Sequence, residues 1–342
     1  MRNILGGGLV LCLLMGGLSA QSLEKRAAAS LPLSAAVAPA DDLIGLLPQS
    51  DLIALIDFHR AFNDLMPRLN DMGVGGPSKM ARELQEFTQK TGIDLTKAQN
   101  AVLSLKFPDT QAYGGLIIQG LDLDDKKLEA AMKAYEADYK ATEYKGKQVI
   151  NLANRGSAPT AGPLSLKADE LALAVPGPQK LAFGDISFVK GIIDIQAGAT
   201  KGGVTKELVS GLNETRNSAL ARFAFSLPEY MRQEALDQGD VFASVAAIKV
   251  ILGTVDMGSD LSLLLDMTMR TPSQKEATEL ETGLRGLVSL AKGFLTGGDL
   301  DLYGQLLEQV KIASKINDVS VTLNMPRSMM DQMGKKPNGE KK

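Results

Sequence analysis

Between residues 41 and 333, hydrophobic residues fall either in short runs that end at turn residues or at the three- and four-residue spacing of a helix. Runs of the first kind predict strands. In the first half these are Leu52–Ile56, Ala101–Phe107, Gly115–Gly120, Val149–Leu152, Leu164–Lys167, Leu171–Val175 and Lys180–Phe183. In the second half they are Ala219–Phe225, Lys249–Met257, Leu261–Met269, Lys311–Ser314 and Val319–Leu323.

Stripes of the second kind predict helices, and most of them follow a residue that can cap a helix. Asp124, Asp185 and Asp299 are N-cap candidates, while Ser226 and Thr271 each open a capping box. The stripes in the first half are Phe62-Leu65-Met66-Leu69, Met80-Leu84-Phe87 ending at Gly92, Leu128-Ala131-Met132-Tyr135-Tyr139 and Ile186-Val189-Ile192-Ile193. The longest stripe follows Thr271 and contains Ala277, Leu280, Leu284, Leu287, Ala291 and Phe294.

Both halves follow the order strand, helix, hairpin, helix, strands. This order predicts two tandem, related α+β units, residues 41–212 with a β-rich middle and residues 213–333. Local hairpins and strands with one polar face favour mostly antiparallel sheets, with helices packed on one face. A chance match of pattern within an ordinary α+β chain is the alternative.

The two ends differ in composition from this region. Residues 1–20 have the pattern of a secretory signal peptide: Arg2, an apolar run from Ile4 to Met15, and small residues up to Ala20. The run is too short to span a membrane, and no later stretch is long enough, so no transmembrane helix is expected in the mature chain. Residues 21–40 are rich in Ala, Ser and Pro and indicate a tether, and residues 334–342 indicate a disordered basic tail.

Three segments resemble recurrent stretches of a family of secreted bacterial proteins of unknown function. They are Leu52–Phe58, Lys90–Asp94 and Leu181–Asp185. The resemblance covers most of residues 45–333. It implies no activity and no functional residues, because none is assigned to that family.

Composition narrows the possible functions. The chain of 342 residues has one His, one Cys, no Trp and a net charge of −3. The only Cys, Cys12, lies within the expected signal peptide, so the mature chain is expected to lack disulfides and thiol chemistry. A multi-His metal site is excluded, and no nucleic-acid partner is expected without excess positive charge.

Candidate chemistry is sparse, and a structural role is the better interpretation of each candidate. His59 has no second His, and in the expected mature chain no Cys, to act with. Ser187–Lys190 and Lys90–Gly92 match S-x-x-K and K-T-G, but in the wrong order for penicillin-recognising enzymes, and Ser289–Lys292 repeats the first match. The carboxylates Asp122, Asp124, Asp125, Asp299 and Asp301 lie in or before first helical turns, where they suit the helix dipole. Asn213-Glu214-Thr215 is a glycosylation sequon. Thioethers can bind Cu(I), but Met325, Met329, Met330 and Met333 are better interpreted as core residues.

We therefore expect no catalytic, cofactor-binding or metal-binding residues and no cofactor. The expected role is that of a non-catalytic periplasmic or secreted envelope protein that binds a partner or builds a structure. Two alternatives remain open at this point. The first is a carrier of an apolar ligand or lipid in a groove between the two units, and the second is a hydrolase that uses carboxylates.

Overall fold

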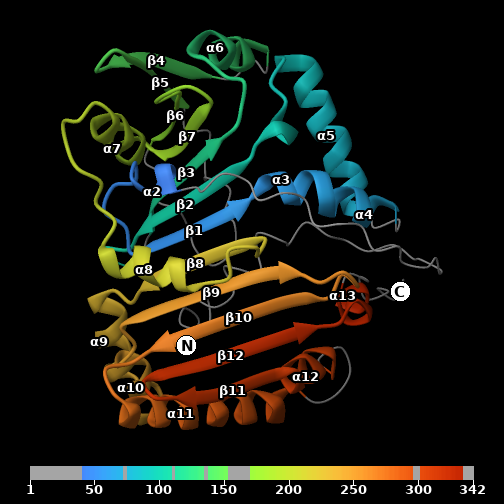
Figure 1. Cartoon of the computed structure of the whole chain (residues 1–342), viewed down its shortest axis with the longest axis vertical. Coiled ribbons are helices and arrows are strands. Elements are labelled where there is room, and N and C mark those ends of the chain that lie inside the picture. The colour runs from blue at the N-terminus through green and yellow to red at the C-terminus, as the bar shows by residue number, and fades with distance from the viewer. Residues whose placement is uncertain are drawn as a thin grey trace, which may run out of the picture. The chain divides into compact units, whose positions relative to one another are not determined.

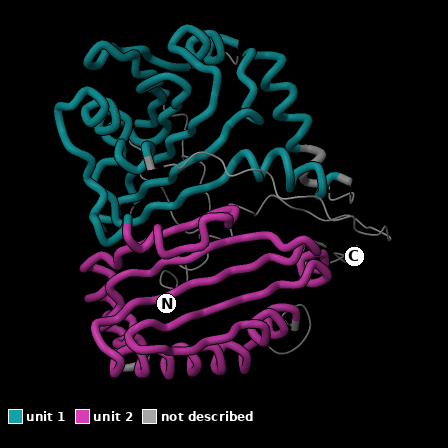
Figure 2. The backbone as a smooth tube through the Cα atoms, in the orientation of Figure 1, with its two compact units in different colours: residues 1–17, 35–209 teal, residues 18–34, 210–342 magenta. Residues whose placement is uncertain are grey.

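The computed structural model describes residues 41–71, 75–109, 112–134, 138–152, 170–295 and 301–333. The chain divides into two compact units, and the division falls between residues 209 and 210, inside one helix. Figure 2 shows the two units in different colours. The expected signal peptide, tether and basic tail, Cys12, the strand Leu164–Lys167 and Asp299 lie outside the described residues.

Unit 1 combines one sheet with short and medium helices (Figure 1). Its strands are β1 (Leu52–Asp57), β2 (Asn100–Lys106), β3 (Tyr113–Gln119), β4 (Tyr139–Tyr144), β5 (Lys147–Leu152), β6 (Leu171–Ala174) and β7 (Lys180–Asp185). Its helical segments are α2 (Asp41–Ile44), α3 (Phe58–Arg60), the π-helix η1 (Ala61–Leu65), α4 (Met66–Asp71), α5 (Gly75–Thr91), the 3-10 helix η2 (Leu95–Lys97), α6 (Asp125–Ala134) and α7 (Ile186–Gln196).

The strands of unit 1 are antiparallel and follow the order β1-β2-β3-β7-β6-β5-β4. Helices cover both faces of this sheet. On one face, Leu128 of α6 packs in a core cluster with Ile150 of β5 and near Ile118 of β3. On the other, Phe188 of α7 lies against Gly115 of β3. Since successive strand residues point to opposite faces, Gly115 and Ile118 place these two helices on opposite sides.

Unit 2 has a second antiparallel array, in the order β8-β9-β10-β12-β11. Its strands are β8 (Ala221–Ser226), β9 (Val250–Met257), β10 (Leu263–Arg270), β11 (Val310–Lys315) and β12 (Asp318–Met325). Its helices are α9 (Glu229–Asp237), α10 (Asp240–Ala246), α11 (Gln274–Phe294), α12 (Asp301–Glu308) and α13 (Arg327–Met333), and α8 (Lys206–Glu214) contains the division between the units.

The long helix α11 covers one face of the unit 2 sheet. Its Leu280 is fully buried in a cluster with Ile312 and Val319 of the last two strands. Along β12, apolar residues on this face alternate with Ser320 and Thr322 on the other, as the alternating sequence predicts. α8 packs on that other face, where Gly211 lies near side chains of β8 and β9.

The prediction of an α+β chain with antiparallel sheets is confirmed. Helices nevertheless lie on both faces in each unit rather than on one. That one unit repeats the other stays a prediction. The helix expected to reach Tyr139 is shorter: α6 spans Asp125–Ala134, and Tyr139 begins β4.

The two expected capping boxes do not form. α9 begins after Pro228 without a side-chain cap, so Ser226 is not its N-cap. α11 begins after Ser273, and the Thr271 hydroxyl instead shares its one proton between the carbonyls of Ser273 and Asn317, each at 2.9 Å. Asp124 and Asp185 do cap as expected, since their carboxylates accept from the backbone N–H groups three residues on.

Candidate functional site

A groove of about 540 Å³ lies in unit 1, between the helical segment η1–α4 on one side and α5 on the other. The two segments are neighbours in the fold (Figure 1). Five of the eleven lining residues are apolar and six are polar, namely three amides, two threonines and one aspartate, although apolar atoms form most of the exposed lining surface. The lining consists of Phe62, Met66, Pro67, Asn70, Ala81, Leu84, Gln85, Thr88, Gln89, Asp94 and Thr96.

The first wall is held in place from the sheet outward. Asp57, the last residue of β1, caps the following helix by accepting from the N–H of Arg60 at 2.8 Å. Phe58 packs against the core cluster of unit 1 and meets Phe62 edge to face, with ring centroids 5.4 Å apart. The Phe62 ring is therefore fixed at the groove by an aromatic contact that reaches the core.

This wall contains a π-helical turn, which Pro67 helps to explain. Proline lacks an N–H, so Pro67 cannot donate to the carbonyl four residues earlier, and its ring crowds that carbonyl. The turn just before it is wide, with the N–H of Met66 bonded to the carbonyl of Ala61. Such π-helical turns are rare in helices, and those that occur are frequently found at functional sites. Here the turn contains Phe62 and precedes Met66, both of which line the groove.

The second wall is the C-terminal half of α5. Phe87 packs toward the core cluster, while Leu84 is partly buried on the groove side. The helix ends at Thr91, and the next residue, Gly92, has a φ of 73°, the left-handed conformation that glycine adopts without strain. The hydroxyls of Thr88 and Thr91 donate to the carbonyls of Leu84 and Phe87, at 2.9 and 2.8 Å.

Asp94 and Thr96 complete the groove after α5. Asp94 is the N-cap of η2, and its Oδ1 accepts from both the N–H and the hydroxyl of Thr96, at 3.0 and 2.6 Å. Among the described residues that line the groove, Asp94 is the only ionisable one. The arrangement combines apolar side chains with one acidic, acceptor-rich end.

The residues singled out in the sequence lie elsewhere. His59 is partly buried on α3, and its backbone N–H donates to the carbonyl of Gln99. It is not among the groove residues. Ser187 is exposed at the start of α7. The ammonium of Lys190 lies 5.3 Å from the ring centroid of Tyr144, in a cation–π contact.

The three carboxylates near α6 have separate roles. Asp122 pairs with Lys127 at 2.7 Å, and the hydrogen bond from that lysine lowers the pKa of Asp122. Asp124 caps the helix. Burial raises the pKa of Asp125, the nearby charge of Lys147 opposes this, and the charge of Asp124 adds to it. Within the described ranges, no group of three or more His, Cys, Asp or Glu side chains could hold a metal ion.

The methionine set lies at the end of β12 and on α13. Met325 and Met329 are buried, with 5% and 8% of their surface exposed. Met330 is partly buried, and the Met333 side chain is not described. These positions suit the expected role of methionine in filling a core.

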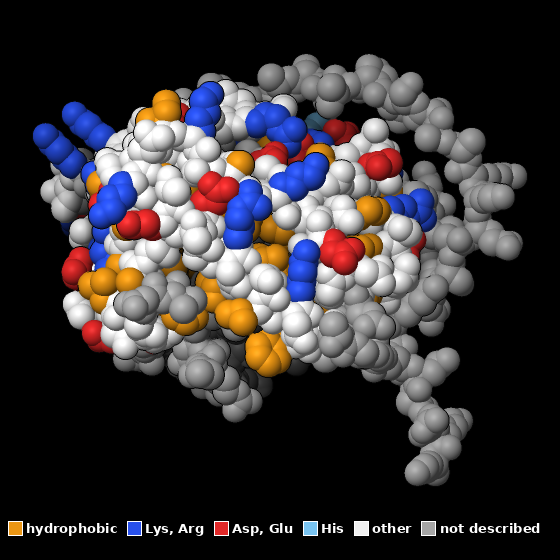
Figure 3. Space-filling view, turned by 90° about the horizontal axis from the view of Figure 1, so that it is seen from below, with side chains coloured by type: hydrophobic (Ala, Val, Ile, Leu, Met, Phe, Trp, Pro, Cys, Tyr) orange, Lys and Arg blue, Asp and Glu red, His pale blue; other side chains and the backbone are white. Residues whose placement is uncertain are grey.

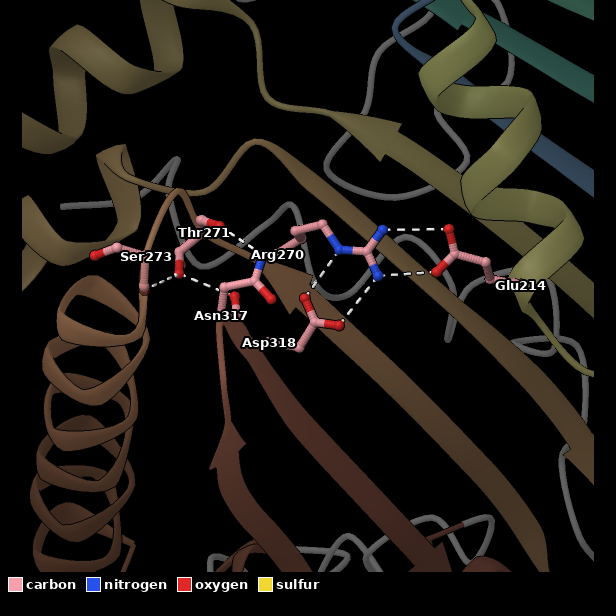
Figure 4. Close-up of polar contacts among 6 residues, drawn as sticks. All are labelled: Glu214, Arg270, Thr271, Ser273, Asn317 and Asp318. Atoms are coloured by element: carbon pink, nitrogen blue, oxygen red, sulfur yellow. Dashed lines mark hydrogen bonds and ion pairs between the residues drawn. The ribbon is translucent and has the colours of Figure 1, made fainter.

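The sequon contributes to a structural network in unit 2 (Figure 4). The Thr215 hydroxyl donates to the carbonyl of Leu212, and Glu214 binds Arg270 through both of its carboxylate oxygens. Arg270 also binds Asp318 on β12. These two carboxylates raise the pKa of Arg270 above its ordinary value. The network therefore joins α8, β10 and β12.

A second apolar surface lies on the outer side of α11. Leu290 and Phe294, one turn apart, are 57% and 80% exposed. Tyr303 of the neighbouring helix α12 is 47% exposed. Figure 3, which views the face that α11 forms, shows hydrophobic side chains among Lys and Arg side chains.

In the described part of the chain, no helix is long and apolar enough to cross a membrane.

Sequence reasoning missed the groove, although four of its eleven lining residues lie in stripes or segments that the sequence analysis names. Phe62, Met66 and Leu84 belong to apolar stripes that predict helices, and Asp94 lies in a segment of family resemblance. A stripe shows which side chains share a helix face but not whether another element covers that face. Pro67 inside the first stripe was the one available signal of irregular backbone.

Comparison with known proteins adds little to this site. No family model matches the chain, and no curated protein matches it. Crystal forms III and I of TP0453 are similar at 6% identity and a TM-score of 0.44, over 84% and 85% of this chain and 95% and 96% of those chains. Crystal form IV is similar at 7% identity and a TM-score of 0.43, over 84% of this chain and 94% of that chain. The findings agree with an uncharacterised family, and similarity this distant supports no transfer of function.

Proposed function

We propose that the protein is an exported, non-catalytic binding protein that carries a mainly apolar small molecule in the groove of unit 1. The observation that carries this proposal is the groove itself, about 540 Å³ in volume, with a lining surface formed mostly by apolar atoms. Small-molecule sites have volumes of roughly 300–1,000 Å³ and are mostly apolar with a few polar groups. The groove meets both criteria, and its position differs from the one expected between the units.

The walls can stabilise an apolar ligand without rearrangement. Phe62, Met66 and Leu84 are partly buried in the free protein, so part of each side chain remains in contact with solvent. A ligand that covers them removes that surface from water, which contributes about 0.8 kcal/mol for each buried methylene group. The edge contact of Phe62 with Phe58 holds one of these side chains in place beforehand.

The mouth of the groove is polar. Asn70, Gln85 and Gln89 are exposed and line it. Amide side chains both donate and accept hydrogen bonds, so they can be satisfied by water when the groove is empty and by a ligand when it is filled. This explains how an apolar groove can stay hydrated and open in the free protein.

Export rests on the N-terminal pattern of Arg2, the apolar run and Ala20. Partner binding, the first expectation from the sequence, is favoured by one structural observation, the exposure of Leu290 and Phe294 on α11. We place it second, because the groove has a definite volume and a mixed lining.

The carrier function can be tested with Nile red, a neutral dye that fluoresces in apolar surroundings. The wild-type protein should bind the dye saturably, with about one site per chain. Ala81 is exposed on the groove side of α5, so Ala81→Trp should fill the groove and weaken dye binding about tenfold or more.

Two control variants make this test specific. Arg82 is exposed on the same helix and does not line the groove, so Arg82→Trp should leave dye binding unchanged. Phe294→Ser removes the most exposed side chain of the α11 surface and should also leave it unchanged. Equal dye binding by the wild type and Ala81→Trp would show that the groove is not the site.

A further inference from the structure

We infer that the groove of unit 1 selects an amphiphile whose polar end is a cationic hydrogen-bond donor, such as a primary alkylammonium, and that Asp94 is its anchor. This inference rests on the proposed carrier function and adds the chemical class of the ligand. It follows from the hydroxyl and carboxyl groups of the groove, which can accept hydrogen bonds from a ligand, while the hydroxyl protons are already used within the protein.

Both hydroxyl groups that line the groove have already used their protons. Thr88 donates its hydroxyl to the carbonyl of Leu84 at 2.9 Å. Thr96 donates its hydroxyl to Oδ1 of Asp94 at 2.6 Å. A hydroxyl has one proton and two lone pairs. What the two threonines can still offer a ligand is therefore their lone pairs, which accept hydrogen bonds.

The Asp94 carboxylate adds an acceptor and a negative charge. Its Oδ1 accepts twice from Thr96, whereas its Oδ2 accepts no hydrogen bond from any described residue. Asp94 forms no ion pair within the described parts of the chain, and it is partly buried, where the charge is less screened than on an open surface. Lys97 and Lys90, three and four residues from it in sequence, are both exposed, and neither is among the lining residues.

The helix that forms the second wall ends at the same part of the groove. α5 is 17 residues long and ends at Thr91, and Thr88 and Gln89 of its last turn line the groove. The C-terminal end of a helix has a partial negative charge, which favours a cation nearby. Asp94 and the C-terminal end of α5 therefore both favour a cationic group.

The apolar and acidic parts together specify the ligand class. An alkyl chain fits against Phe62, Met66 and Leu84, and an ammonium group can donate to Asp94 Oδ2 and to the threonine oxygens. An anionic head group would instead meet a carboxylate and oxygen lone pairs. Only the amides of Asn70, Gln85 and Gln89 could donate to it.

The test compares three ligands that share one chain: dodecylamine, dodecanol and dodecanoate. Each is added to the full wild-type chain with Nile red bound, at neutral pH and below its micelle concentration. Dodecylamine should displace the dye at about tenfold lower concentration than dodecanol, because a hydrogen bond between charged partners is stronger than one between neutral partners. Dodecanoate should be the weakest competitor of the three for the dye site.

Asp94→Asn tests the anchor while it preserves the cap of η2, because Asn caps helices about as well as Asp. This variant should bind dodecylamine about tenfold less tightly and dodecanol as before. Glu86→Gln is the matched control: Glu86 is exposed on α5, does not line the groove, and its loss changes the net charge equally. It should retain the preference for the amine.

The outcomes separate this inference from the proposed function. If all three ligands displace the dye equally, or if Asp94→Asn keeps the preference for the amine, the anchor role is wrong and the carrier function stands. If neither the dye nor any of the three ligands binds the groove, the carrier function fails, and the inference fails with it.

Discussion

Arg270 and Asp318 are direct partners across β10 and β12, and their side chains share two hydrogen bonds, Nε to Oδ1 at 2.9 Å and Nη2 to Oδ2 at 3.0 Å. The same guanidinium binds Glu214 at the end of α8, at 3.2 and 2.8 Å. One side chain therefore joins two strands and a helix of unit 2. Its planar, five-donor geometry is suited to two carboxylates, and a lysine could not reproduce it.

Removing this guanidinium should destabilise the protein measurably. Arg270→Met leaves Glu214 and Asp318 without their shared cation, and we expect a loss of about 1–2 kcal/mol in the free energy of unfolding, reduced by partial exposure to solvent. Urea unfolding gives the value from the midpoint. Lys275→Met is the control, because its pair with Glu279 is long, at 3.8 Å, and highly exposed, and it should cost less than about 0.5 kcal/mol. Equal losses for the two variants would contradict this role of Arg270.

The contribution of Glu214 should depend on pH. The hydrogen bond and charge of Arg270 hold the pKa of Glu214 below its ordinary value of 4.5. A carboxyl whose pKa is lowered on folding stabilises the protein above its unfolded pKa and loses that contribution as the pH falls through the folded pKa. Glu214→Gln should therefore be less stable than the wild type at neutral pH, and the two should converge below pH 4.5. Urea midpoints between about pH 7 and pH 3 measure this, and a constant difference across that range would exclude the ion pair as its source.

Replacing each of two glycines with alanine should change the stability of the protein in opposite directions. A Cβ at Gly115 of β3 would lie 2.2 Å from the Phe183 carbonyl oxygen and 2.6 Å from Phe188 of α7, so Gly115→Ala should cost about 1–3 kcal/mol or more. At Gly286 of α11 nothing lies within 4 Å, so Gly286→Ala should stabilise by about 0.5–1 kcal/mol. Thermal melts of the two variants test the pair. A stable Gly115→Ala would mean that α7 can move away from the sheet.

Local patterns predicted most strands and the two aspartate caps, because the groups that form them are near one another in sequence. Asp124 and Asp185 each accept from an N–H three residues later, and that geometry follows from the start of a helix alone. The Thr271 hydroxyl behaves differently, since it donates to the carbonyl of Asn317, far away in the chain. A tertiary partner of this kind leaves no local pattern.

The groove depends on such tertiary placement throughout. The stripes that contain Phe62 and Leu84 specify two amphipathic helices, but only packing decides how closely those helices approach. The π-helical turn before Pro67 changes where Phe62 lies, and no periodicity predicts it. That Oδ2 of Asp94 accepts no hydrogen bond from the described residues is likewise a property of the folded cap, because the sequence does not show which carboxylate oxygen Thr96 binds.

The apolar stripe of α11 allows a graded prediction along one helix. Leu280 is fully buried against the sheet, Leu284 is partly buried against the same cluster, and Leu290 is 57% exposed. Leu280→Ala should cost about 2–5 kcal/mol, because it removes buried methyl groups and leaves a cavity. Leu284→Ala should cost less, and Leu290→Ala should change stability by no more than about 0.5 kcal/mol. Urea unfolding of the three variants measures the gradient; a cost at Leu290 as large as that at Leu280 would show that the outer side of α11 is covered in solution.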